Sequence, residues 1–252
     1  MTATRVNKSS PLTHHNSPTP RRRVGDPYIT TIDFISLIIG LYGYQQITSI
    51  QLPPHLQDAG HWQFLTNLSL VYSLFVFLVG FVAHITKSHT LFLFKNNLHP
   101  IGLALETIVA GVYWPLRLFF LHLLTKDPSK FYLPLSTDLC IHLMPVVSLL
   151  IDYLVFMPRW TISDNTALGF VVLLTTFYWV LLDNLIDVEN GGSYPYEFLN
   201  VEKDSQRILV FAVVAAVAFA QFLFMRRVYD WVVGKTEEAS DKIDEELDKK
   251  EM

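Results

Sequence analysis

Long apolar stretches alternate with short polar connections along most of this chain. A membrane-spanning helix needs about 20 mainly apolar residues. Six windows meet that requirement, at roughly 29–50, 62–86, 99–124, 136–157, 165–187 and 207–233. Each window must be helical, because unpaired backbone groups are very unfavourable in lipid. The pattern therefore predicts an all-α polytopic membrane protein with six transmembrane helices.

The composition supports this class and divides the chain into three regions. Of 252 residues, 51% are hydrophobic, which is too apolar for a soluble domain of this length. The formal net charge is only −4, which argues against nucleic acid as a partner. The single cysteine, Cys140, excludes an internal disulfide and a cysteine metal cluster. We expect a basic, disordered tail over 1–28, a membrane domain over 29–233 and a charged tail over 234–252.

Lysine and arginine residues close to the spans indicate how the chain is oriented. Most of them lie on the cytosolic side if both ends of the chain are cytosolic. This group comprises the cluster 21–23 together with Lys87, Lys95, Arg159, Arg226, Arg227 and Lys235. We therefore predict that both termini are cytosolic, which agrees with an even number of spans.

Several polar side chains inside the spans are candidate functional groups, because ionisable residues are unfavourable in lipid. At the helical rise, Thr66, Arg117, His142 and Asp183 lie about 6–10 Å below the outer ends of four different spans. The four residues therefore predict one polar pocket. For any one of them alone, holding helices together is an equally good explanation.

Other polar residues receive less specific predictions. Asp33 and His84 lie near predicted cytosolic helix ends, where solvated or snorkelling side chains are expected. Asp152 is a deeper charge with no assigned partner. Glu106 shares a helix face with Arg117 but is too distant for a direct contact.

The motifs exclude several familiar membrane chemistries. The chain has no Gly-x-Ser-x-Gly elbow and no phosphate-binding glycine loop, so a standard serine hydrolase or a nucleotide-driven pump has no support. Its nine histidines do not form close-spaced ligand boxes, and no metal is expected. A threonine and a histidine at matched depth remain, which is the minimal pair for nucleophilic ester cleavage. From this pattern alone, catalysis has less support than a membrane carrier for a small polar or lipid ligand, or a non-catalytic scaffold.

Three short segments change that balance. They are Gly60 to Ser69, which contains an aromatic-x-x-Leu-Thr sequence, Asp138 to Pro145, and Tyr194 to Leu199. In order and spacing they resemble the androgen-induced protein and androgen-dependent TFPI-regulating protein family of multi-span membrane threonine hydrolases. The resemblance extends over roughly residues 29–233 and leaves both tails outside.

The resemblance implies an activity and assigns roles to residues. Members of that family cleave fatty acid esters of hydroxy fatty acids with an intramembrane threonine and histidine, which match Thr66 and His142. No cofactor is implied. Asn67, Arg117 or a backbone N–H group could stabilise the oxyanion, and Asp183 could orient His142 or pair with Arg117.

The resemblance also indicates partners, whereas no motif in the sequence specifies a location. A lipid ester substrate and membrane lipids are the expected partners, and the sequence assigns no oligomeric state. The endoplasmic reticulum membrane is the expected location, with the plasma membrane as the alternative. The Leu143-Met-Pro sequence after His142 and the long N-terminal tail depart from the family pattern. They leave the ester substrate less closely defined than the Thr66–His142 pair.

Overall fold

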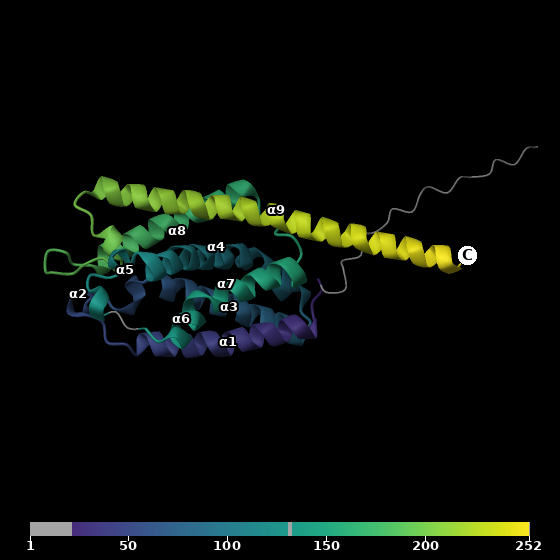
Figure 1. Ribbon diagram of the computed structural model, residues 1–252, viewed down its shortest axis with the longest axis horizontal. Coiled ribbons are helices and arrows are strands. Elements are labelled where there is room, and N and C mark those ends of the chain that lie inside the picture. The colour runs from purple at the N-terminus through teal and green to yellow at the C-terminus, as the bar shows by residue number, and fades with distance from the viewer. Residues whose placement is uncertain (1–21, 131–132, 252) are drawn as a thin grey trace, which may run out of the picture.

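The computed structural model describes residues 22–130 and 133–251, which form helices and contain no strand (Figure 1). The predicted all-α class is therefore confirmed. The long helices are α1 (Pro27–Thr48), α3 (Leu65–Thr86), α4 (His89–Phe119), α8 (Asp164–Leu185) and α9 (Asp204–Glu251). A further segment consists of α6 (Leu135–His142), α7 (Met144–Ile151) and the π-helical η3 (Asp152–Phe156). Short helices lie in the connections: α2 (Pro54–Gln57), η1 (His61–Gln63), α5 (Leu121–Leu124), η2 (Pro128–Lys130) and η4 (Glu197–Leu199).

Five segments within the described residues are long and apolar enough to cross a membrane. They are α3, α4, the α6–η3 segment, α8 and the part of α9 up to Lys235. Helix α1 equals α3 in length, but Asp33 and the Gln45–Gln46 pair make it more polar, and it is not among the five. A sixth span and the cytosolic location of both termini stay predictions.

Local capping interactions determine where the long helices begin and turn. The Asp26 carboxylate accepts a hydrogen bond from the Tyr28 N–H at 2.8 Å and begins α1. The hydroxyls of Ser88 and Ser163 cap α4 and α8 in the same way. Lys87, in the left-handed conformation at φ 52°, ends α3 and turns the chain directly into α4.

Helix α4 begins ten residues before the predicted third span. The prediction that Lys95 is a cytosolic flanking charge is therefore wrong, since Lys95 lies inside α4 and is fully buried. A hydropathy average counts a lysine as unfavourable whatever its partners, whereas this lysine is ion-paired within the bundle.

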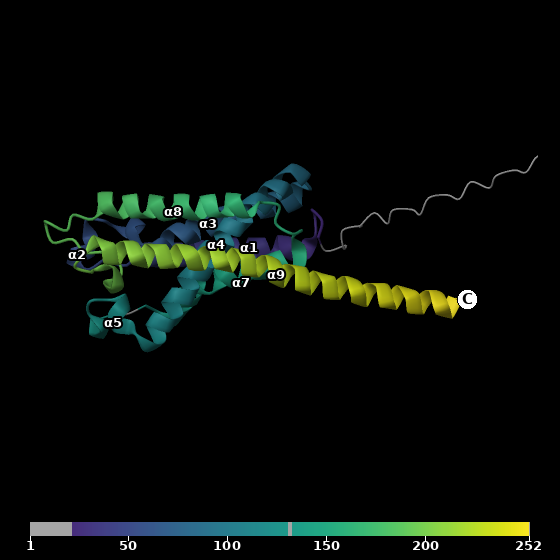
Figure 2. The ribbon, with the colours of Figure 1, turned by 90° about the horizontal axis from the view of Figure 1, so that it is seen from above.

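The bundle has a central part, whose residues are largely buried, and a peripheral part, whose residues are largely exposed. Helices α1, α3, α4 and α7 enclose a core that includes Phe77, Leu103, Leu149 and Tyr153. Helices α8 and α9 pack against each other, and α9 also contacts α4 (Figures 1 and 2). In the most apolar part of α3, 56% of the residues are buried, against 17% in α8 and 6% in α9.

Candidate active site

Two of the predicted site residues, Thr66 and His142, lie next to each other. The hydroxyl oxygen of Thr66 is 3.4 Å from Nε2 of His142. Both residues are buried, with exposures of 8% and 4%. Thr66 is in the first turn of α3, and His142 is the last residue of α6. The structure thus brings together two groups that are 76 positions apart in the chain.

The turn before α3 places Thr66 at a helix N-terminus. Gly60 has φ +63°, a conformation that glycine adopts without strain, and Phe64 is extended just before the helix starts. The Leu65 N–H donates to the Tyr196 hydroxyl at 3.1 Å. Because the first N–H groups of a helix lack acceptors within it, this end of α3 is rich in hydrogen-bond donors and carries the positive end of the helix dipole.

A break between α6 and α7 positions His142. The backbone leaves the helical conformation at Leu143, two residues before Pro145, which has no N–H to continue the ladder. The Trp114 indole N–H donates to the His142 carbonyl at 3.3 Å. The Tyr113 ring stacks on the imidazole, with centroids 3.4 Å apart and planes within 7°. The ring is therefore held on one face and shielded from water.

Asp138 completes the arrangement and was not among the predicted site residues. Its carboxylate is 2.8 Å from Nδ1 of His142, one helical turn away in α6, and is 1% exposed. An ionised carboxylate only accepts hydrogen bonds, so Nδ1 holds the imidazole proton and Nε2 faces Thr66 as an acceptor. The i,i+4 spacing of Asp138 and His142 was the signal that sequence reasoning missed.

The predicted role of Asp183 is wrong. It was expected to orient His142 or to pair with Arg117, but Asp138 does both, with Arg117 Nε 3.5 Å from its second carboxylate oxygen. Asp183 lies at an exposed position of α8 near Tyr194. Equal depth along two helices does not fix the direction in which a side chain points, and Asp183 is exposed whereas Thr66 and His142 are buried.

The two predicted oxyanion donors are both engaged. Asn67 donates its amide to the His61 carbonyl at 2.8 Å and so holds the turn before α3. Arg117 lies beyond Asp138 as seen from His142. The Tyr196 hydroxyl interacts with Thr66 and accepts a hydrogen bond from the Leu65 N–H at 3.1 Å. Burial raises the pKa of Tyr196 above its usual range, so its hydroxyl keeps the proton that it could donate.

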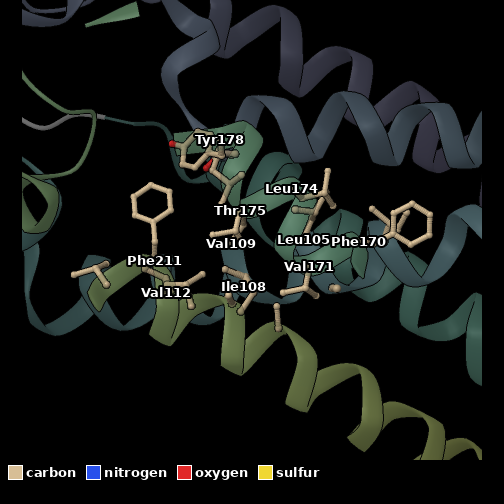
Figure 3. A pocket seen from close by; sticks show the side chains of 18 of the residues that line it. Leu105, Ile108, Val109, Val112, Phe170, Val171, Leu174, Thr175, Tyr178 and Phe211 are labelled. Atoms are coloured by element: carbon tan, nitrogen blue, oxygen red, sulfur yellow. The ribbon is translucent and has the colours of Figure 1, made fainter. Parts of the chain in front are cut away.

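An apolar cavity lies beside Thr66 and extends along α4, α8 and α9. Its polar end is lined by Thr66, Tyr113, Tyr178 and Tyr196. Figure 3 shows side chains from the three helices pointing into it, among them Leu105, Val109, Val171, Leu174 and Phe211. The Thr66 hydroxyl of the pair therefore borders a space that suits a hydrocarbon chain.

A second buried polar cluster lies on the cytosolic side of the predicted topology. Lys95 Nζ is 3.0 Å from Asp33 and 2.7 Å from Asp152, and His99 Nε2 is 3.5 Å from the same Asp152 oxygen. All four side chains are at most 1% exposed. Gly80 of α3 makes room, because a Cβ there would lie 2.5 Å from Lys95 Nζ.

The structure on this side of the bundle corrects the predictions for three residues. Asp33 and His84 are buried at 0% and 3% exposure rather than solvated, and Lys95 and His99 provide the partners that Asp152 lacked. Glu106 lies deep in α4, where it accepts a hydrogen bond from the Ser73 hydroxyl at 2.8 Å.

Comparison with known proteins gives a family match over the whole membrane region. Residues 28–230 match the model of a family described as FAR-17a/AIG1-like protein. A UPF0641 membrane protein of Saccharomyces cerevisiae is 32% identical over 230 residues, covering 85% of this chain and 96% of that protein. A UPF0641 membrane protein of Schizosaccharomyces pombe is 30% identical over 173 residues, covering 69% and 77%. No solved structure matches this chain.

Proposed function

Because the chain belongs to the FAR-17a/AIG1-like family of membrane proteins, we propose that it is an intramembrane hydrolase of lipid esters. The proposed substrates are fatty acid esters of hydroxy fatty acids, with Thr66 as nucleophile and His142 as general base. The observation that supports this most strongly is the Thr66–His142–Asp138 arrangement at the end of an apolar cavity. A hydroxyl, an imidazole and a carboxylate in this order form the constellation used for acyl transfer on several unrelated folds.

In the first step, Nε2 of His142 accepts the Thr66 proton while the Thr66 oxygen attacks the ester carbonyl carbon. The Thr66 O–C bond forms and the ester C–O bond breaks. The departing alkoxide of the hydroxy fatty acid takes the proton from His142. Asp138 holds Nδ1–H and stabilises the imidazolium that forms between these proton transfers.

In the second step, water regenerates the threonine. His142 accepts a proton from water, whose oxygen attacks the acyl carbon on Thr66. The bond between Thr66 and the acyl group breaks, the Thr66 oxygen recovers the proton from His142, and a fatty acid leaves. The Tyr196 hydroxyl, which interacts with Thr66 and accepts a hydrogen bond from the Leu65 N–H, is the proposed donor to the developing oxyanion.

The 3.4 Å separation of Thr66 and His142 is compatible with this role. It is longer than an optimal hydrogen bond, and catalytic hydrogen bonds are often long until the substrate is bound. Substrate that occupies the cavity would bring the carbonyl carbon between the threonine oxygen and the oxyanion donors.

The proposal is tested by hydrolysis of a fatty acid ester of a hydroxy fatty acid by the purified protein in detergent. Thr66→Ala and His142→Ala should lose turnover while they remain monodisperse and thermally stable. Thr86→Ala and His89→Ala are matched controls, since both residues are exposed at the opposite end of the bundle. Wild-type turnover in either site variant would remove that residue from the mechanism.

A lipid carrier is the second candidate, and the apolar cavity favours it, because a carrier needs such a space and no nucleophile. The carrier would be established by two results together. The wild-type protein would show no esterase activity, and Thr66→Ala would still transfer lipid between proteoliposomes. Loss of hydrolysis in Thr66→Ala would establish the hydrolase.

We place this activity in the endoplasmic reticulum membrane. The membrane location agrees with the five apolar helices and with the membrane-protein relatives. Fluorescence imaging of the tagged full-length chain with markers for that membrane and for the plasma membrane distinguishes the two locations.

A further inference from the structure

We propose that the cavity between α4, α8 and α9 is a slot for one acyl chain, and that its inner end sets the longest acyl group that is hydrolysed. This deepens the proposed function and rests on it. The acyl group is the part of the substrate that becomes attached to Thr66. Its carbonyl carbon would therefore lie at the Thr66 end of the slot.

The slot has two ends that differ in chemistry. At the outer end it meets Thr66, Tyr113 and Tyr196, all within the candidate active site. At the inner end it is lined by Ala167 and Phe222, which are buried at 4% and 3% exposure. Phe222 stacks on Trp160, with centroids 5.6 Å apart, so the inner wall belongs to the packed core.

The length of the slot matches an ordinary membrane acyl chain. It runs along α4 from Tyr113 to Pro100 and along α8 from Tyr178 to Ala167. At the helical rise these distances are about 20 Å and about 17 Å. The hydrocarbon chains of one leaflet span about 15 Å, half of the bilayer core, so a long-chain acyl group would fill the slot.

The lining selects a chain that ends in a methyl group. Inward of Thr175, the side chains that line the slot are aliphatic or aromatic: Leu174, Val171, Phe170, Leu105, Ala218 and Phe222. Figure 3 shows several of these pointing into the same space. A carboxylate in such surroundings would have no partner, which is strongly unfavourable. The carboxylate of the hydroxy fatty acid must therefore stay outside, and the acyl group enters.

Several of the side chains that line the slot are only partly covered by protein, which is consistent with a bound acyl chain. Helices α8 and α9 bury few of their own residues, although both are strongly apolar. Val171, Leu174, Val214 and Ala218 are only half-buried along the slot. A bound chain would cover these surfaces and complete the packing between α4 and α8.

Two alanines of α9 provide a matched pair of variants. Ala218 lines the slot, whereas Ala216 is exposed on another face of the same helix. Ala218→Phe should shorten the slot, and Ala216→Phe should not. The assay measures hydrolysis of a series of p-nitrophenyl esters from butyrate to stearate by the full-length protein in detergent.

We expect Ala218→Phe to lower kcat/KM for palmitate and stearate by about tenfold or more, and to leave butyrate within about twofold. Ala216→Phe should keep the wild-type chain-length profile. An unchanged profile in a folded, active Ala218→Phe protein overturns the slot while leaving the hydrolase intact. A wild-type protein that hydrolyses no ester overturns the proposed function instead.

Photo-crosslinking tests the slot without turnover. The probe is a palmitoyl ester with a diazirine at its terminal carbon, bound to Thr66→Ala so that it is not cleaved. Labelling should concentrate on peptides that contain Ala167, Ala218 and Phe222, and should fall in the presence of excess unlabelled palmitoyl ester. Labelling that is confined to exposed residues such as Ala216, or that excess ester does not reduce, contradicts the slot whatever the protein hydrolyses.

Discussion

The bundle contains two buried polar clusters that differ in access. The outer cluster consists of Thr66, His142, Asp138 and Arg117, and the cavity beside Thr66 reaches it. The inner cluster consists of Asp33, Lys95, His99 and Asp152, and all its side chains are at most 1% exposed. Both clusters hold charged side chains inside the bundle, where ionisable groups are unfavourable unless they are paired.

The difference shows that intramembrane charge alone does not identify an active site. In the inner cluster one ammonium group pairs with two carboxylates across α1, α4 and η3, and the cavity beside Thr66 is not lined by these residues. In the outer cluster the neutral Thr66 hydroxyl faces Nε2 of His142. The charged residues Asp138 and Arg117 lie on the Nδ1 side of the imidazole. We infer that the outer cluster performs chemistry and that the inner cluster holds helices together.

The largest effect is expected for Thr66→Ala. Loss of the nucleophile should lower turnover by at least about a thousandfold. Stability should change little, because the variant removes one hydroxyl beside a cavity. Turnover and thermal unfolding of the same detergent-purified sample provide the check, and a folded variant with normal turnover would contradict the assignment of the outer cluster.

The second largest effect is expected for Lys95→Met, and it concerns stability. Removing the ammonium group leaves two buried carboxylates without compensation, which should destabilise the fold by about 3–5 kcal/mol. A triple variant that also contains Asp33→Asn and Asp152→Asn should recover most of this loss. Chemical or thermal unfolding in detergent measures both variants. If the triple variant is as unstable as Lys95→Met, pairing of these charges is not how the cluster stabilises the fold.

Asp138→Asn should give a smaller effect that separates positioning from binding. The amide keeps the shape of the carboxylate but does not stabilise the imidazolium, so kcat should fall by about a hundredfold or more. KM should change little, because Asp138 does not line the cavity. Steady-state kinetics of Asp138→Asn measure both constants. A rise in KM with unchanged kcat would place Asp138 in substrate binding.

The smallest effect is expected at an exposed ion pair. Arg159 Nε is 2.6 Å from Asp230, but the two side chains are 42% and 50% exposed. Arg159→Ala should therefore cost less than about 1 kcal/mol and leave turnover unchanged. A loss close to that of Lys95→Met would mean that burial does not distinguish the two ion pairs.

The sequence predicts the helices and the central pair better than the groups around that pair. Hydropathy locates most ends of the long helices to within about five residues. It misses the start of α4, where the paired Lys95 and His99 resemble a loop, and the end of α9, which continues to Glu251 through the predicted charged tail. Depth counting brings Thr66 and His142 to one level, and the structure places them in contact. Depth along a helix does not define the direction in which a side chain points. The sequence therefore predicts Asp183 as the partner of His142, whereas Asp138 is the carboxylate that contacts it.

The cavity could not be predicted from the sequence at all. Most of its lining consists of apolar residues of α4, α8 and α9, which have the same composition as lipid-facing positions. Only the distance between three helices decides whether such residues enclose a space or fill it.

The most direct test of the central claim is the mass of the peptide that contains Thr66 after acid quench of the enzyme turning over a palmitate ester. We predict an added palmitoyl group on Thr66, which is absent from Thr66→Ala. Continued hydrolysis with no acyl group on Thr66, under conditions that trap acyl esters on a reference threonine or serine enzyme, would contradict Thr66 as the nucleophile.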